Sequence, residues 1–408
     1  MTNKLSAYKV YLIYIGISAF LFELVFTVNE LYRIEVAGFN ALQLVLVGTA
    51  LELSCFIFEV PTGILADTKS RKLSVIIGLV LIGIGFLIEG LVTSFIVIMM
   101  CQVIWGLGVT FTSGADEAWI ADELGGKNLE QLFLKGAQIS QVGALLAIII
   151  STIIGTKMIN LPMILGGILF IVLGLFLFIY MPETAFHPTP SENRDSFRQM
   201  IRTFTSGLKS IKGKHFLIIM VGIFFIYGLY SEGLDRLWIA HILENVTLSS
   251  VNVKPIVWVG FINGISMITS IIGVEYIKRK LNKTGKLQKV WLLIIINSIM
   301  VLSIIAFGLA KNFTLAFTSY MSYYILRTTN RPIYRAWLNE NIESKVRATV
   351  LSTYGQIDSL GQILSGPLIG FIALKTNTSI SLVSSGLVLA PVIILYFYLL
   401  KRVKTSSS

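Results

Sequence analysis

Apolar runs of about 20 residues recur from one end of the chain to the other, and each is long enough to cross the roughly 30 Å hydrocarbon core of a bilayer as an α-helix. The polar stretches between these runs are too short to form a soluble domain. Charged residues make up only 13% of the chain, whereas a soluble domain carries about a quarter. The sequence therefore predicts an all-α integral membrane protein.

We expect twelve transmembrane helices. The only long polar stretch separates six of them from the other six. The predicted domains are therefore an N-terminal six-helix bundle at 1–182, a cytoplasmic linker at 183–214 and a C-terminal six-helix bundle at 215–408. Within the linker we expect at most one amphipathic turn, at 197–208. The predicted spans are 8–33, 40–67, 71–91, 94–122, 129–155, 160–182, 215–243, 253–278, 286–310, 313–338, 347–374 and 378–400.

Lys and Arg are concentrated in alternate connections between the predicted spans. The connections after the second, sixth and eighth spans are rich in both, and the intervening ones carry about one cation each. Since basic loops remain in the cytoplasm, we predict a multi-pass protein of the cell membrane with both termini cytoplasmic. This topology accounts for the net charge of +11, and no nucleic-acid partner is expected.

Other function classes lack a signal in the sequence. Cys55 and Cys101 fall inside apolar runs, and the three histidines are scattered, so neither a disulfide framework nor a metal site is predicted. The chain has no Gly-rich phosphate loop ending in Lys-Ser/Thr, which disfavours ATP-driven transport. We expect neither enzymatic activity nor a cofactor.

The two halves of the chain contain matching segments. Residues 118–122 (AWIAD) correspond to residues 336–340 (AWLNE), a shift of 218 positions, from 118 to 336. The same shift places Gln138 on Gln356 and Gly143 on Gly361 without a gap. Three matches in one register indicate a parallel internal repeat, in which two six-helix halves are related by an axis along the membrane normal.

A loop between the second and third spans carries the clearest motif. Its sequence, GILADTKSRK at 63–72, resembles the signature loop of major facilitator superfamily transporters. Asp67 and Arg71 are placed to form charge-assisted contacts at the cytoplasmic mouth. The loop departs from the family pattern at Thr68, where a basic residue is usual, and at Ser70, where glycine is usual.

The fourth span also resembles this family. The segment 102–108 (QVIWGLG) is similar to a second motif, associated with proton-coupled exporters, except that Gln102 replaces its arginine. Asp122 matches the family's acidic residue at the inner end of this span. The resemblance, to the bacterial twelve-helix drug/proton antiporter type, implies alternating access driven by a proton gradient. It also implies that the first, fourth, seventh and tenth spans line a central cavity.

Ionisable side chains within these spans are the candidate functional residues, because charges in a membrane are costly and usually face the bundle interior. Glu23, Glu52 and Asp116 are the candidates for proton coupling. The alternative is that such residues form structural salt bridges or reach headgroups at helix ends, which we favour for Asp122, Arg33 and Glu59. The substrate-cavity candidates are Glu117, Tyr227, Glu232, Asp235, Tyr323, Arg327 and Arg331. Abundant aromatic residues on these spans suit flat amphiphilic or cationic compounds, although Trp238 and Trp337 are expected in the interfacial belt.

Gating contacts are predicted at both mouths. Asp67, Arg71 and Asp122 are expected to stabilise the closed inner mouth together. The repeat places Glu117 on Arg335, which predicts an inner latch between the halves. A weaker alignment places Glu30 on Arg236, which predicts an outer latch. The competing interpretation is local pairing, of Glu232 with Arg236 and of Asp358 with Arg331 or Arg335.

The leading functional hypothesis is a secondary transporter that exports a small amphiphilic or drug-like compound in exchange for protons. The alternative is uptake or exchange of an anionic metabolite bound by Arg327, Arg331 and Arg335, which recur every fourth residue along the tenth span. A second alternative is a non-transporting membrane receptor or scaffold. The expected partners are the lipid bilayer, a small-molecule substrate and protons, and the protein is expected to function as a monomer. Whether the arginines face carboxylates or an open cavity separates the first two hypotheses.

Overall fold

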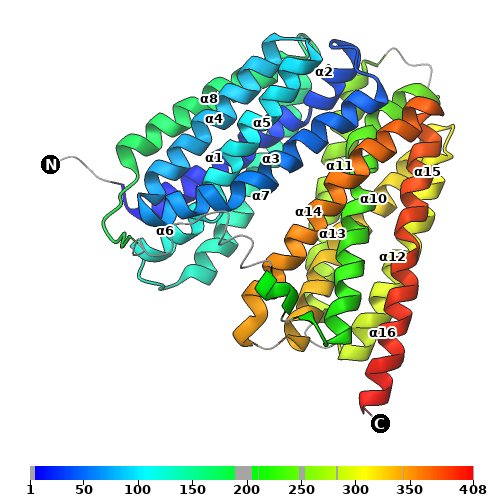
Figure 1. Cartoon of the computed structure of the whole chain (residues 1–408). Helices are drawn as coiled ribbons and strands as arrows, with labels where there is room; N and C mark the ends of the chain where they lie inside the picture. Colours follow the sequence, from blue (N-terminus) through cyan, green and yellow to red (C-terminus); the bar gives the residue numbers. More distant parts are fainter. Residues whose placement is uncertain are drawn as a thin grey trace. The chain divides into compact units, whose positions relative to one another are not determined.

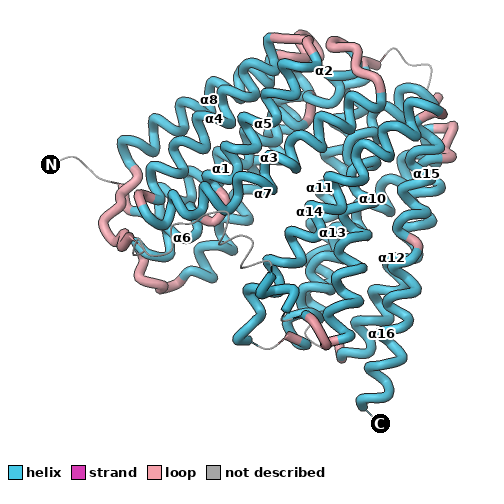
Figure 2. Tube along the Cα trace, in the orientation of Figure 1, coloured by secondary structure: helices cyan, strands magenta, loops and turns pink. Residues whose placement is uncertain are grey.

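The computed structural model describes residues 5–188, 205–209, 211–247, 253–281, 284–342 and 344–407. These residues are almost entirely α-helical (Figures 1 and 2). Among them, eleven helical stretches are long and apolar enough to cross a membrane. The prediction of an all-α, multi-pass membrane protein is therefore confirmed. Most of the predicted amphipathic turn at 197–208 lies outside the described residues.

The helices follow the predicted spans closely. The first six spans are α1 (Ala7–Phe26) with α2 (Asn29–Glu35), α3 (Ala41–Thr68), α4 (Arg71–Leu91), α5 (Phe95–Thr112) with α6 (Ala115–Glu123), α7 (Leu129–Gly155) and α8 (Leu161–Tyr180). The last six are α10 (His215–Asn245), α11 (Pro255–Leu281), α12 (Lys286–Gly308), α13 (Phe313–Asn341), α14 (Ser344–Lys375) and α15 (Thr378–Leu389) with α16 (Pro391–Ser407).

Of the twelve predicted spans, α13 is the one that is not among the eleven helical stretches long and apolar enough to cross a membrane. It has 29 residues, which at 1.5 Å per residue is about 44 Å and exceeds the thickness of a bilayer core. Its composition sets it apart, because it carries Arg327 at its midpoint and Arg331 and Arg335 in its second half. The helix that is least apolar is thus the one that carries the basic stripe.

The fourth span is interrupted between α5 and α6. Gly114 has a φ of +73° there, a conformation that glycine adopts without the steric cost of a Cβ atom. The break places Asp116 and Glu117 in the first turn of α6, where the positive end of the helix dipole favours acidic side chains. A glycine thus sets where the two acidic residues of this span lie.

The chain divides into two compact units. The first comprises Met1–Phe39, Ala50–Met200 and Lys254–Gly260, and the second comprises Asn40–Thr49, Ile201–Val253 and Phe261–Ser408. In the first unit, α1 packs on α7 and α8, while α4 packs on α5 and α8. In the second, α10 packs on α14 and α15, while α12 packs on α13 and α15. Equivalent helices therefore pair in the same order, as expected for two six-helix repeats.

Close helix crossings keep the register that the sequence predicts. A Cβ atom added to Gly143 on α7 would lie 2.9 Å from the carbonyl oxygen of Gly16 on α1. A Cβ atom added to Gly361 on α14, 218 positions later, would press on the carbonyl oxygen of Phe225 on α10. In each unit a glycine lets the fifth helix approach the first more closely than a side chain would allow.

An ion pair is also duplicated at this shift. Arg71 at the start of α4 pairs with Asp122 at the end of α6. At positions 218 residues later in both cases, Lys289 at the start of α12 pairs with Glu340 at the end of α13. The sequence comparison had matched the two acidic residues, and the structure adds the two basic partners. Each unit thus joins its third and fourth spans by one ion pair at the same end.

The expectation that Trp238 and Trp337 lie in an interfacial belt is wrong. Trp337 is 0% exposed, with its ring centroid 5.0 Å from that of Phe216. Trp238 is 8% exposed and stacks on Tyr320 at 4.8 Å. Both residues lie on helix faces that pack against neighbouring helices, so position along a span did not predict which side of the helix they occupy.

Candidate functional site

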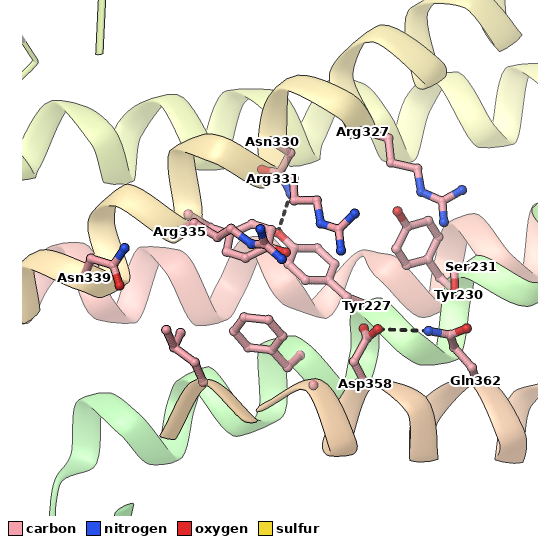
Figure 3. A pocket seen from close by; sticks show the side chains of 14 residues that line it. Tyr227, Tyr230, Ser231, Arg327, Asn330, Arg331, Arg335, Asn339, Asp358 and Gln362 are labelled. Atoms are coloured by element: carbon pink, nitrogen blue, oxygen red, sulfur yellow. Dashed lines mark hydrogen bonds between the residues drawn. The ribbon is translucent and has the colours of Figure 1, made fainter. Parts of the chain in front are cut away.

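A cavity of about 700 Å³ lies within the second unit, between α10, α13 and α14 (Figure 3). We call it the α13 cavity. Three of the predicted substrate-site residues, Tyr227, Arg327 and Arg331, line it, as does the predicted latch residue Arg335. The complete lining is Phe224, Tyr227, Tyr230, Ser231, Arg327, Asn330, Arg331, Tyr334, Arg335, Asn339, Leu351, Gly355, Asp358 and Gln362.

The first arginine of the stripe is held by the protein itself. The Arg327 guanidinium donates two hydrogen bonds to the Asp235 carboxylate, with Nη2 to Oδ2 at 2.8 Å. It also donates to the Tyr323 hydroxyl at 2.9 Å. A paired fork of this kind fixes the orientation of both groups and cancels their charges. Asp235 and Tyr323, both predicted substrate-site residues, therefore lie beside Arg327 rather than in the cavity lining.

The next two arginines face the cavity. Arg331 and Arg335 project from consecutive turns of α13 (Figure 3), and both are exposed. Neither makes a hydrogen bond or an ion pair with any residue in the described part of the chain. Of the competing interpretations for this stripe, an open cavity thus applies to Arg331 and Arg335, and an embedded carboxylate applies to Arg327.

One carboxylate enters the cavity from the facing helix. Asp358 on α14 is half-buried, and its Oδ2 accepts a hydrogen bond of 2.9 Å from Nε2 of Gln362, one turn further along (Figure 3). The local pairing expected between Asp358 and Arg331 or Arg335 is not formed, because no ion pair joins these described residues. The cavity therefore contains an acidic group and two basic groups that form no ion pair with each other.

Aromatic rings form another part of the wall. Tyr227 and Tyr230 lie on α10 with centroids 6.2 Å apart, and Tyr334 of α13 lies 6.0 Å from Tyr227. Phe224 contacts Tyr334 edge-on at 5.3 Å. Such a wall offers ring faces and edges to a flat apolar group, beside the guanidinium groups of α13.

A buried hydrogen-bond network holds this wall in place. The Tyr227 hydroxyl donates to Oδ1 of Asn297 at 3.0 Å, accepts from Nδ2 of Asn330 at 2.9 Å and lies 3.2 Å from the Tyr396 hydroxyl. Sequence reasoning singled out Tyr227 and missed its partners. The available signal was the presence of Asn297 and Asn330 in membrane spans, where buried polar groups need hydrogen-bond partners.

The proton-coupling candidates lie in the N-terminal half of the chain. Asp116 accepts a hydrogen bond from the buried Tyr14 hydroxyl at 3.1 Å and another from the Glu117 backbone nitrogen at 2.8 Å. Glu23 is half-buried on α1, and its carboxylate makes no hydrogen bond with the described residues. Glu52 is half-buried on α3. These three residues come from three different helices, α1, α3 and α6.

The contacts predicted among Asp67, Arg71 and Asp122 at the signature loop are formed in the first unit. The Arg71 guanidinium pairs with the Asp122 carboxylate, lies 3.6 Å from Oδ1 of Asp67 and donates to the Ala118 carbonyl oxygen at 2.8 Å. The motif position Ser70 caps the start of α4 by accepting from the Leu73 backbone nitrogen. The structure thus brings all three predicted residues together.

The residues of the two predicted latches have local neighbours. Glu30 accepts a hydrogen bond of 2.7 Å from Arg33, and Nε of Arg236 lies 3.5 Å from Oε2 of Glu232. Glu117 is exposed, and Arg335 lines the α13 cavity. The proposed latches join one unit to the other, so both stay predictions. Glu232, a substrate-site candidate, is 1% exposed and does not line the cavity.

A buried polar cluster near the end of the first span was missed. Glu89, in the middle of an apolar run, is 0% exposed. It accepts from Nε of Arg33 at 2.7 Å and from Nε2 of Gln102 at 2.8 Å. The Trp105 indole donates to the Gln102 amide oxygen at 2.8 Å. Gln102, the departure from the family motif, thus joins a carboxylate to an indole by using both ends of its amide.

In the described part of the chain, no group of three or more His, Cys, Asp and Glu residues is placed to hold a metal ion.

Proteins similar to this chain are transporters. A family model described as Major Facilitator Superfamily matches residues 11–355. YxaM of Bacillus subtilis (strain 168), an uncharacterised MFS-type transporter, is 24% identical over 363 residues, which cover 88% of this chain and 87% of that protein. The structure of the nucleoside transporter NupG matches with a TM-score of 0.76 and 15% identity, over 97% of this chain and 98% of NupG. A bacterial homologue of the human lysosomal transporter Spinster matches with a TM-score of 0.74 and 14% identity, over 97% of each chain.

Proposed function

Because the chain belongs to the major facilitator superfamily, we propose that it is a secondary transporter of a small organic anion, which binds in the α13 cavity and crosses the membrane by alternating access. The observation that carries this proposal is the state of Arg331 and Arg335. Both project from a predicted membrane-spanning helix into an open cavity, and neither forms an ion pair or a hydrogen bond with another described residue. A guanidinium in such surroundings is costly unless an anion or water compensates it.

The neighbouring pair supports the same substrate class. Arg327 already has a carboxylate partner in Asp235, so the fold neutralises one arginine of the stripe and leaves the next two. Guanidinium groups bind carboxylates and phosphates through two parallel hydrogen bonds. A substrate anion would thus supply to Arg331 and Arg335 what Asp235 supplies to Arg327.

The second candidate function is proton-driven efflux of an amphiphilic or drug-like compound. Two observations favour it. The ring wall at Tyr227, Tyr230 and Tyr334 offers an apolar surface, and Asp116 with its Tyr14 partner is an embedded carboxylate suited to proton exchange. The ring wall suits the apolar part of either substrate. The two candidates differ in whether that substrate carries an anionic group.

Thermal unfolding of the purified full-length protein separates them. The probes are benzoate, benzamide and benzylamine, which share one ring and differ in charge, followed by larger aromatic triples of the same kind. We expect the anion of a triple to raise Tm more than its amide or amine. The substitutions Arg331→Gln and Arg335→Gln should remove that preference, whereas Arg279→Gln, an exposed arginine of α11 paired with Glu275, should keep it.

Flux then tests transport itself. Proteoliposomes that contain the protein are loaded with the best-bound anion, and exchange of the labelled compound is followed with and without a pH gradient. Exchange that is lost in Arg331→Gln and retained in Arg279→Gln supports an anion transporter. Equal exchange by all three proteins contradicts the role of Arg331. Binding without any flux would favour the non-transporting receptor.

A further inference from the structure

The α13 cavity has a second charged end, which the anion does not use. We infer that the substrate also carries a cationic group, an ammonium or its equivalent, and that Asp358 and Gln362 bind it. The substrate class is then a zwitterion or an anion with one amine, held between α13 and α14. This inference rests on the proposed function, since it adds a second contact to the same substrate.

The Asp358 carboxylate is only partly occupied by the protein. Its Oδ2 accepts one hydrogen bond, from the Gln362 amide at 2.9 Å. Its Oδ1 receives none from the described residues, and the side chain lines the cavity. Because the Gln362 amide donates its nitrogen to Asp358, its own carbonyl oxygen remains as a second acceptor. An ammonium group has three N–H donors, and these two acceptor oxygens, one of them charged, would satisfy two of them.

The arginines across the cavity do not supply a hydrogen-bond donor to these two oxygens. Arg331 and Arg335 extend from α13, and Asp358 with Gln362 extends from the facing α14 (Figure 3). No ion pair joins the two sides within the described residues. The geometry keeps a basic side and an acidic side apart, with the aromatic wall of Tyr227 near both. A substrate with separated charges fits this arrangement, and a simple anion leaves Oδ1 of Asp358 without a hydrogen-bond donor among the described residues.

The internal repeat indicates that these charges are not needed for folding. At the 218-residue shift, Asp358 corresponds to Ser140, Gln362 to Ala144 and Arg331 to Ser113. The first unit forms the same helix pairs without these charges. By contrast, the ion pair at the start of the third span is kept in both units. Charges present in one repeat only are therefore better explained by a ligand than by the fold.

The alternative role for Asp358 is to carry a proton, and it involves the same neighbouring groups. The charged and titratable groups around it are Arg327 and Arg331 on α13, Tyr230 on α10 and Asp235, which is held by Arg327. The Arg327 guanidinium is already bound to the Asp235 carboxylate through two hydrogen bonds. A proton on Asp358 would also lower the cost of its burial, but a proton alone would not require the second acceptor on Gln362. The binding experiment distinguishes a substrate cation from a proton.

Matched probes test the cationic contact. We would use 4-(aminomethyl)benzoic acid and 6-aminohexanoic acid, which separate an amine from a carboxylate by a ring or a flexible spacer. Each is compared with its N-acetyl derivative, which keeps the anion, and with its carboxamide, which keeps the amine. Dissociation constants are measured by calorimetry on the full-length protein in detergent at one pH.

In the wild-type protein, N-acetylation should weaken binding about tenfold to a hundredfold, the worth of a charge-assisted hydrogen bond. Asp358→Asn should bind the zwitterion and its N-acetyl derivative equally. Gln362→Glu, a second variant in case Asp358→Asn does not fold, should increase the preference for the free amine. Glu275→Gln, an exposed acidic residue of α11, should leave the preference unchanged.

The outcomes separate the two proposals. If wild type binds the N-acetyl acids as tightly as the zwitterions, the cationic contact is refuted, whereas loss of binding by the carboxamides still supports the anion. If neither the zwitterions nor the N-acetyl acids bind, both proposals fail for this cavity. A preference for the amine that persists in Asp358→Asn and does not change in Gln362→Glu assigns the cation to another residue and overturns the inference.

Discussion

The close approach of α14 to α10 at Gly361 gives a prediction with a matched control on the same helix. A Cβ atom added there would lie 2.9 Å from the Leu229 backbone nitrogen and 3.0 Å from the Gly228 Cα atom, and it would press on the Phe225 carbonyl oxygen. These are backbone atoms, so no side chain can rotate away. A Cβ atom added at Gly355 on the same helix would meet nothing within 4 Å.

The difference between the two alanine variants isolates the helix crossing. Replacing glycine with alanine inside a helix stabilises it by about 1 kcal/mol at either position, and this gain cancels in the comparison. Overpacking typically costs about 1–3 kcal/mol. We therefore expect Gly361→Ala to be less stable than Gly355→Ala by about 1–3 kcal/mol.

The assay is unfolding of both purified variants under identical detergent and lipid conditions, followed by helical circular dichroism. Gly143→Ala, at the equivalent crossing of the first unit, should fall between them, because its nearest contact is the Gly16 carbonyl oxygen at 2.9 Å and the next atoms lie 3.6 Å away. Equal stability of Gly361→Ala and Gly355→Ala would refute the close crossing as a determinant of the fold.

Three further substitutions test the polar contacts. Glu89→Gln removes the charge that Arg33 contacts at 2.6 Å in a fully buried position, so unfolding should become easier by about 1.5–3 kcal/mol, the worth of a charged hydrogen bond. Tyr227→Phe leaves the buried amides of Asn297 and Asn330 without their hydroxyl partner. It should lower the free energy of unfolding by about 1–3 kcal/mol and raise the Kd for aromatic anions measured by calorimetry. Unchanged stability and Kd would contradict the positioning role of Tyr227. Asp122→Asn removes a partly exposed partner of Arg71 and should change stability by less than about 1 kcal/mol, while spin-label distances across the predicted inner mouth should shift toward the open state.

The sequence by itself determined the architecture. Apolar runs of about 20 residues become helices in a bilayer, because a helix satisfies its backbone hydrogen bonds within the segment, whereas the strands of a closed β-barrel are shorter and alternate in polarity. The 218-residue repeat then predicted the equivalence of Gly143 with Gly361, and the structure confirms that both lie at close crossings. The signature loop predicted the meeting of Asp67, Arg71 and Asp122, because its residues are close in sequence or at the ends of neighbouring spans.

The sequence did not determine which charges pair. Arg327, Arg331 and Arg335 are alike in sequence, with the same spacing on one helix. Only the packing of α10 against α13 places Asp235 on Arg327 and leaves the other two facing a cavity. Similarly, Glu89 was not selected as a candidate, because its partners Arg33 and Gln102 come from other helices.

The physical reason is a difference in range. Whether a segment spans a membrane depends on its summed hydrophobicity and length, which are local properties of the sequence. Whether a buried charge is neutralised depends on contacts of about 3 Å, and these follow from the rotation and register of packed helices. The tertiary structure alone therefore decided that Asp358 stands opposite Arg331 across a cavity and that no ion pair joins them.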